Sequence, residues 1–181
     1  MGWPIPELRC AICGRQVDPF GPYFRASGAF LPASDPLAKL CNAPFHWACY
    51  ERWPHRPRFA GRYVEAWIKA NRSNPFWWAV HVDERVYVSV NPERRIEEAS
   101  VRLWAVGSDI RVPLPRWAEW LAAPERVCPG LQAIERAGLA EVLPTLRERF
   151  PDDHAVVNAI DPGEKPGRGA AKRTASGGRA R

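Results

Sequence analysis

The 181-residue sequence has no apolar run long enough to cross a membrane, which takes about 20 residues in a helix. Its start, Met-Gly-Trp-Pro-Ile-Pro-Glu, has neither the basic nor the apolar region of a secretory signal peptide. Pro6 stands where an N-myristoylation pattern requires serine or threonine. We therefore expect a cytoplasmic protein without a membrane partner, whose five cysteines are kept as thiols rather than disulfides.

The sequence also lacks the short motifs of common enzyme classes. There is no H-E-x-x-H, no G-x-S-x-G, no phosphate-binding loop after a strand, and no H-x-E with P-C-x2-C of zinc deaminases. His154 follows two aspartates at an expected helix start, and His81 falls on an expected strand face near a turn. A non-enzymatic protein is the favoured interpretation, and an enzyme with an unrecognised site near His81 or His154 is an alternative.

The positive charge of the chain is concentrated at one end. The net charge is +6, yet residues 162–181 carry six basic side chains against Glu164, which leaves +1 for residues 1–161. Residues 161–181 are rich in glycine, alanine and basic residues and contain no aromatic side chain, so we predict a disordered basic tail. Such a tail can hold nucleic-acid phosphates weakly and without sequence specificity. The rest of the chain lacks the basic footprint of a nucleic-acid-binding domain.

What the sequence does contain is a cysteine and histidine pattern typical of a metal site. Cys10 and Cys13 form C-x2-C, and His46 and Cys49 follow as H-x2-C after a gap of 32 residues. Two thiols at this spacing suit a tight knuckle, and residues three apart on a helix share one face. Three thiolates and one imidazole complete a tetrahedron, so the pattern predicts one structural Zn²⁺ rather than a catalytic one. Four unrelated buried residues, or a redox C-x2-C, are the alternatives.

Two further cysteines bear on this assignment. Cys41 lies five residues before His46 and is the alternative fourth ligand, but the helical offset between His46 and Cys49 favours His46. Cys128 is distant in sequence, and we interpret it as an ordinary buried or loop thiol.

The ligand pattern resembles the treble-clef group of zinc fingers, over residues 10 to about 53. In that group a knuckle supplies two ligands and a helix start supplies two more, with a hairpin between them. The spacing is similar to the first half of a LIM module and more loosely to RING-type domains, yet Tyr50-Glu51-Arg52-Trp53 follows Cys49 without a second ligand set. This departure argues against a LIM module and a two-zinc RING, so ubiquitin-ligase activity is not carried over.

Hydrophobic patterning predicts an α+β fold with a four-stranded antiparallel meander and C-terminal helices. Before the sheet we expect a hairpin over residues 23–31, a helix over 42–53 capped by Asn42, and a helix over 57–70. The strands are expected at 78–82, 86–90, 100–106 and 109–113, with Glu84, Arg85 and Arg102 on the polar face. Helices are then expected at 115–121, 130–137 ending at Gly138, 139–150, and from Asp152 or Asp153 to Ile160.

The predicted organisation is a zinc-binding module at 1–56, an α+β domain packed on it at 57–160, and the tail at 161–181. We expect most of the nine tryptophans to fill the core, and we name Trp77, Trp78, Trp117 and Trp120 as candidates for a contact patch, although core burial is the expected fate of each. The favoured function is a zinc-stabilised module that binds another protein. Nucleic-acid binding through the zinc module and the tail is the second hypothesis.

Overall fold

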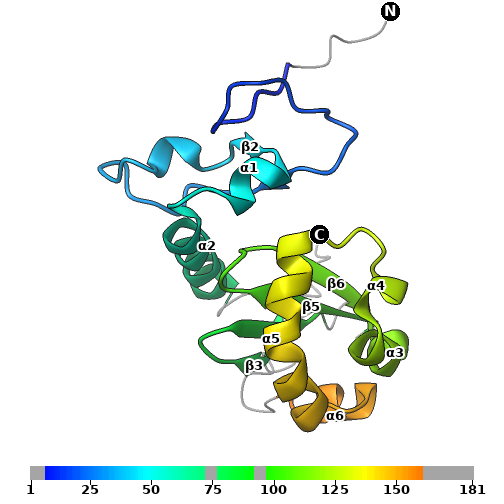
Figure 1. The fold of residues 1–181 in the computed structure, drawn as a ribbon. Coiled ribbons are helices and arrows are strands. Elements are labelled where there is room, and N and C mark those ends of the chain that lie inside the picture. Colours follow the sequence, from blue (N-terminus) through cyan, green and yellow to red (C-terminus); the bar gives the residue numbers. More distant parts are fainter. Residues whose placement is uncertain (1–6, 72–76, 92–96, 161–181) are drawn as a thin grey trace, which may run out of the picture.

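The computed structural model describes residues 7–71, 77–91 and 97–160 (Figure 1). The first part of the chain forms short elements around a two-stranded antiparallel sheet, in which Phe24 pairs with Phe45. These elements are β1 (Phe24–Arg25), η1 (Ala38–Leu40), β2 (Pro44–Phe45), α1 (Trp47–Glu51) and the long α2 (Arg56–Asn71).

The second part is a four-stranded antiparallel sheet in the order β3-β4-β5-β6, which confirms the predicted meander. Asp83 and Glu84 lie in the turn between the first two strands, as the alternation on either side of them predicted. The strands are β3 (Trp78–Val82), β4 (Val86–Val90), β5 (Glu98–Leu103) and β6 (Asp109–Pro113). The helices that follow are η3 (Leu114–Arg116), α3 (Trp117–Ala122), α4 (Pro124–Val127), α5 (Ala133–Arg149) and α6 (Asp153–Asn158).

Two expectations for the first part are wrong. Residues 29–31 form no strand, because β1 pairs with β2, about twenty residues further along the chain. The expected helix over 42–53 is shortened to α1, since Asn42 adopts a left-handed φ of 65° and Pro44–Phe45 is used as a strand. Asn42 therefore caps no helix; its side-chain oxygen accepts a hydrogen bond of 2.7 Å from the Gly28 amide.

The two helices expected on either side of Gly138 are one continuous helix, α5. A Cβ at Gly138 would lie 3.0 Å from Leu103 Cδ1 and 3.4 Å from Val106 Cγ2, so this glycine lets α5 approach the sheet closely. Pro144 is also inside α5 and costs one hydrogen bond of the helix. Burial of Leu139, Val142 and Leu146 against the sheet outweighs both helix-breaking preferences.

We predict that Gly138→Val lowers the free energy of unfolding by about 1–3 kcal/mol, because the added methyl groups overpack a filled core. Gly61 is the matched control, since it also lies inside a helix but a Cβ there would meet no atom within 4 Å. Chemical denaturation of the two valine variants measures the difference. Equal losses at both positions would mean that helix propensity, rather than contact with Leu103, explains the effect.

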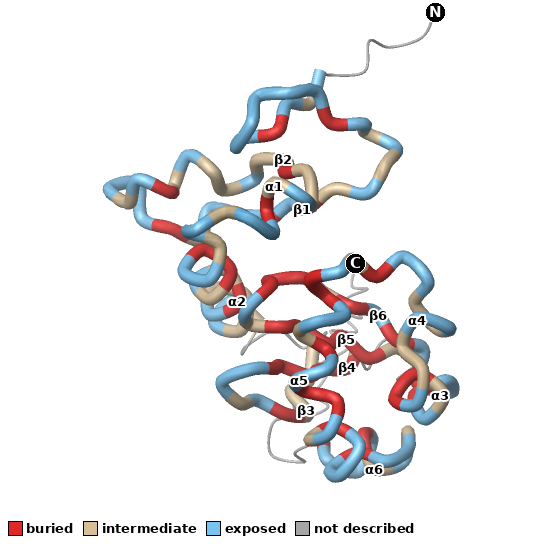
Figure 2. Tube along the Cα trace, in the orientation of Figure 1, coloured by how far each residue is buried: buried red, intermediate tan, exposed pale blue. Residues whose placement is uncertain are grey.

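One face of the sheet forms the main core with the C-terminal helices (Figure 2). Val86, Val88 and Val101 are fully buried there, beneath α5 and the two tryptophans of α3. Trp117 Nε1 donates a hydrogen bond of 2.7 Å to the carbonyl of Phe150, which ties α3 to the end of α5. Asp152 caps the last helix by accepting from the Ala155 amide at 2.7 Å, as predicted.

The alternating pattern placed Arg102 on the polar face of the sheet, and the structure buries it on that face. The side chain of Arg102 is 5% exposed and pairs with Asp109 at 3.0 Å. Its guanidinium lies 3.9 Å from the ring centroid of Trp67 on α2. Helix α2 thus covers part of this face, and Arg102 lies between the sheet and the helix. Glu84 and Arg85 are exposed, as expected.

A second, aromatic cluster joins the first part of the chain to the sheet. It contains Phe24, Phe45, Tyr50 and Phe59, all buried. Tyr50 Oη donates a buried hydrogen bond of 2.9 Å to the carbonyl of Val106 in the turn before β6. Because Phe59 belongs to α2, this cluster extends across residue 56, and the division at 56/57 stays a prediction.

Candidate metal centre

The first half of the centre is a tight turn that carries Cys10 and Cys13. The Gly14 amide donates to the Cys10 carbonyl at 2.8 Å, and the Cys10 amide donates to the Arg15 carbonyl at 2.9 Å. Gly14 has a φ of 70°, a left-handed conformation that glycine adopts without strain. Arg9 and Gln16 close the turn as an antiparallel bridge. The turn therefore holds both thiols on one short, hydrogen-bonded loop.

The second half comes from the start of α1. His46 is the residue immediately before the helix and Cys49 lies within it, so the two are not both in helical turns as predicted. Their spacing still places them together, because the Cys49 amide donates to the His46 carbonyl at 3.0 Å. The two halves dock through the Ala11 amide, which donates to Pro44 O at 3.0 Å, and the His46 amide, which lies 3.4 Å from Cys10 Sγ.

The four ligand atoms form a compact group whose members all lie within 4.8 Å of one another. His46 Nδ1 is 3.5 Å from Cys13 Sγ and 4.0 Å from Cys49 Sγ. Tetrahedral zinc, with Zn–S near 2.3 Å and Zn–N near 2.0–2.1 Å, separates its donors by roughly 3.6–3.8 Å. The distances at Nδ1 are close to these values, so the residues fit one tetrahedral metal ion.

The imidazole of His46 is oriented by a contact outside the cluster. Nε2 lies 2.9 Å from the carbonyl oxygen of Gln16, which can only accept, so Nε2 carries the hydrogen. In the neutral ring the lone pair is then on Nδ1, the nitrogen that faces the sulfurs. Metal-ligating histidines commonly donate their other N–H to a carbonyl in this way, which fixes the tautomer and increases ligand basicity.

The surroundings of Cys13 favour its thiolate. Hydrogen bonds from the Arg15 amide and then from the Arg15 guanidinium lower the pKa of Cys13 to about 6. The same contact with Cys13 raises the pKa of Arg15, and a contact with Cys13 also raises the pKa of His46. The cationic side chain of Arg15 offsets part of the negative charge of the Cys13 thiolate.

The other two ligand thiols are shifted in opposite directions. Burial raises the pKa of Cys10, but donation from the backbone amides of Cys13 and His46 outweighs it, so the net direction is downward. Burial raises the pKa of Cys49, and its proximity to Cys13 adds to that. Metal binding displaces thiol protons, so a bound cation would supply the charge that stabilises all three thiolates together.

Cys41 and Cys128 lie outside the cluster. Cys41 packs against the aromatic cluster around Phe45 rather than replacing His46. Cys128 follows α4, is partly buried against the main core, and its Sγ donates to the Arg111 carbonyl at 3.4 Å. Arg15 and Gln16 were not among the predicted site residues. The positive charge of Arg15, directly after Gly14 of the knuckle, could have indicated its role. Gln16 contributes only its backbone carbonyl, which the amino-acid sequence does not indicate.

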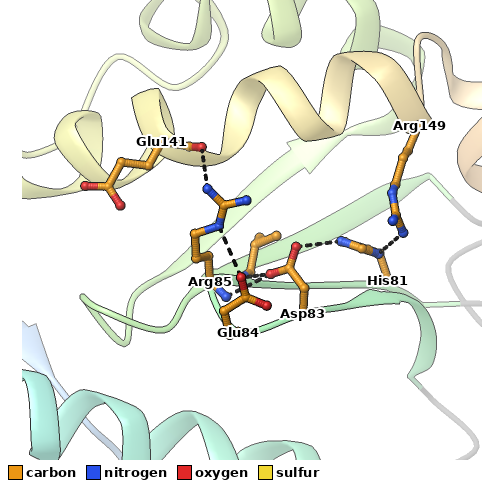
Figure 3. Close-up of polar contacts among 7 residues, drawn as sticks. His81, Asp83, Glu84, Arg85, Glu141 and Arg149 are labelled. Carbon is orange, nitrogen blue, oxygen red and sulfur yellow. Dashed lines mark hydrogen bonds and ion pairs between the residues drawn. The ribbon is translucent and has the colours of Figure 1, made fainter.

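The proposed alternative site at His81 is a structural network (Figure 3). His81 is 8% exposed; its Nε2 is 3.0 Å from Asp83 Oδ2 and its Nδ1 is 3.3 Å from Arg149 Nη1. Both ring nitrogens therefore have a side-chain partner. The contacts tie the β3–β4 turn to the end of α5. His154 is exposed on α6.

The four tryptophans considered for a contact patch separate into two pairs. Trp117 and Trp120 are 0% exposed and pack against each other in the core with ring centroids 5.0 Å apart, so they cannot contact a partner. Trp77 and Trp78 are half-buried, and the ring of Trp77 lies 4.5 Å from the guanidinium of Arg111.

Searches against models of known protein families, curated proteins and solved structures found no match. Within the described residues, no helix has the length and apolar character needed to span a membrane. The predicted basic tail, residues 161–181, lies outside the described residues.

Proposed function

We propose that Cys10, Cys13, His46 and Cys49 bind one structural Zn²⁺. The observation that carries this proposal is the convergence of four donors from two distant segments, with Nδ1 of His46 directed at the sulfurs. Thiolate and imidazole donors in a tetrahedral group are typical of zinc, and four protein ligands leave no open position for substrate. The ion would hold the turn at Cys10 against α1 rather than perform chemistry.

A treble-clef arrangement is part of the same proposal. The order of a cysteine knuckle, a short strand pair and a helix start that bears the last two ligands supports it. The second strand, Pro44–Phe45, leads directly into His46, so the strand pair positions the third ligand. Because each strand has two residues and α1 has five, these elements are too short to be stable without the ion or tertiary packing.

We further propose that the protein is a non-enzymatic interaction module that binds another protein in a reducing, cytoplasmic setting. A closed ligand set, a near-neutral chain before the tail, and the engagement of both His81 nitrogens support a binding role over a catalytic one. Nucleic-acid binding stays the second hypothesis and depends on the charge of residues 162–181. Salt-sensitive retention on DNA or RNA that is lost on truncation at Asp161 would favour it.

The zinc proposal predicts one zinc per chain in the purified protein and a large loss of affinity in His46→Ala. Removing one of four ligands leaves an incomplete tetrahedron, so the variant should release zinc to a chelator that leaves the wild type loaded. Elemental analysis with a competing chromophoric chelator measures both quantities. Cys41→Ala is the matched control, because it removes a nearby residue outside the cluster and should retain zinc. Zinc loss in the control, or full retention in His46→Ala, would contradict the ligand assignment.

A further inference from the structure

We propose that a groove between residues 27–30 and α2 binds an acidic peptide segment of a partner protein, with one bulky apolar side chain inserted at its inner end. The inference rests on the proposed function and names the surface and the class of partner. Two adjoining cavities of about 600 and 210 Å³ form this α2 groove. Ala29, Phe30, Ala66 and Ala70 line both of them, so the cavities are continuous.

The smaller cavity is an aromatic slot. Phe30, Tyr63 and Trp67 line it together with Ala66 and Ala70. The Phe30 and Tyr63 rings are in contact, with centroids 5.0 Å apart, and the guanidinium of Arg102 stacks on Trp67. Rigid aromatic walls around a small apolar space are the usual receptor for a single anchoring side chain of a partner. Ala66 and Ala70 have short side chains, which let the backbone of a peptide lie close to α2.

The wall opposite α2 is held in place by the segment that carries the metal centre. Gly28 has a φ of 94°, and its amide donates to the side-chain oxygen of Asn42 at 2.7 Å. The Asn42 amide in turn donates to Ala26 O at 2.9 Å. Phe30 also meets Phe59 of the aromatic cluster edge-on, with ring centroids 4.9 Å apart. The groove is therefore formed before a partner arrives, which lowers the entropy cost of binding.

The charge of α2 selects the partner. The charged side chains that line the wider cavity are Arg62, Lys69 and Glu65, a net charge of +1. Arg62 is paired with Glu65 at 2.8 Å, and among the described residues no ion pair of Lys69 is found, so the exposed ammonium of Lys69 is the free charge of the groove. An acidic peptide segment complements the positive charge at the wider cavity. The smaller cavity is apolar and takes a side chain rather than a phosphate group, so a peptide fits better than a nucleic-acid backbone.

The test uses the full-length, zinc-loaded protein and a fluorescein-labelled synthetic peptide of aspartates and glutamates around one phenylalanine. Fluorescence anisotropy should report saturable binding that weakens as salt is added. The same peptide with serine in place of phenylalanine should bind about tenfold more weakly, because the slot then stays empty. Ala66→Glu, which places a carboxylate on the groove floor, should weaken binding by a similar factor, and Lys69→Glu by about threefold.

The controls separate the groove from general charge and from folding. Ala140→Glu on α5 and Lys39→Glu on η1 make the same changes outside the α2 groove and should bind like the wild type. Lys69 is exposed, so its variant should fold even if Ala66→Glu does not. Equal binding by the serine peptide or by both groove variants, or binding of a labelled single-stranded oligonucleotide in preference to the peptide, would overturn the proposal. Zinc content measured on the same samples distinguishes loss of peptide binding at the groove from loss of the metal ion.

Discussion

Cys13→Ser should abolish stoichiometric zinc binding and unfold about the first 60 residues, the segment around the metal centre. The reason is that structural zinc contributes its binding free energy directly to folding. The elements there are short, and apart from the aromatic cluster they have few apolar contacts of their own. Apparent binding free energies of about 10–16 kcal/mol are typical of structural zinc, so its loss should outweigh the packing of these short elements. Near-UV circular dichroism should lose the signal of the cluster that contains Tyr50.

The four-stranded sheet should remain folded in this variant, because its core is a separate cluster beneath α3 and α5. Amide hydrogen exchange can follow both parts, with early exchange in α1 and continued protection in β4 and β5. Cys41→Ala is the control for the loss of a thiol in the same segment. A Cys13→Ser variant with unchanged near-UV signal and melting temperature would refute the structural role of the metal.

The contact between the two parts limits how local this unfolding is. The Tyr50 hydroxyl donates a hydrogen bond to the carbonyl oxygen of Val106. In addition, α2 packs closely on the turn before β6, since a Cβ at Gly107 would lie 3.3 Å from Ala60 Cα. Loss of the aromatic cluster therefore leaves the Val106 carbonyl without its partner and loosens the packing of α2. We expect the sheet to survive with lower stability rather than unchanged, because an unpaired buried polar group costs about 1–3 kcal/mol.

The sheet was predictable because its determinants are local. Alternating valines on each side of Asp83-Glu84 indicate two antiparallel strands joined by a turn, and the structure pairs Trp78 with Val90 and Val82 with Tyr87. The register shift between Ala79 and His81 was not predictable from this alternation. Asp152 was predictable as a cap for the same reason, since its oxygen reaches an amide only three residues away. The spacing of Cys10, Cys13, His46 and Cys49 was likewise enough to find the cluster, although not its local backbone.

The wrong predictions concern residues whose conformation is determined by contacts with residues distant in the sequence. No local sequence pattern predicts that Phe24 pairs with Phe45. Gly138 was predicted to end a helix, but it lies inside α5 because Leu103 occupies the space that a side chain would need. The left-handed Asn42 was interpreted as a cap because asparagine suits both roles, and its bond to Gly28 was not visible in the sequence. Each of these residues was judged by propensity, and tertiary packing determined the outcome.

Arg102→Met should cost about 3 kcal/mol of unfolding free energy, a value at the low end for removing one partner of a buried ion pair. The low end is expected because Asp109 keeps two other partners, Arg111 at 2.5 Å and the hydroxyl of Ser100. The variant also loses the stacking of the guanidinium on Trp67. Chemical denaturation measures the change, and α2 should exchange its amides faster because its contact with the sheet is weakened.

Arg111→Met is the matched control, since Arg111 binds the same carboxylate but its side chain is 39% exposed against 5% for Arg102. Solvent screens an exposed pair, so we expect about 1 kcal/mol or less for this variant. Both arginines also stack on a tryptophan, Trp67 for Arg102 and Trp77 for Arg111. Arg111 has a second carboxylate partner, Glu98 at 3.0 Å, so a smaller loss for Arg111 arises in spite of an additional ion pair. Equal losses would mean that burial by α2 adds nothing to the Arg102 pair. A larger loss for Arg102 would show that its burial between the sheet and α2 contributes to stability, at a contact that also involves Trp67 of the α2 groove.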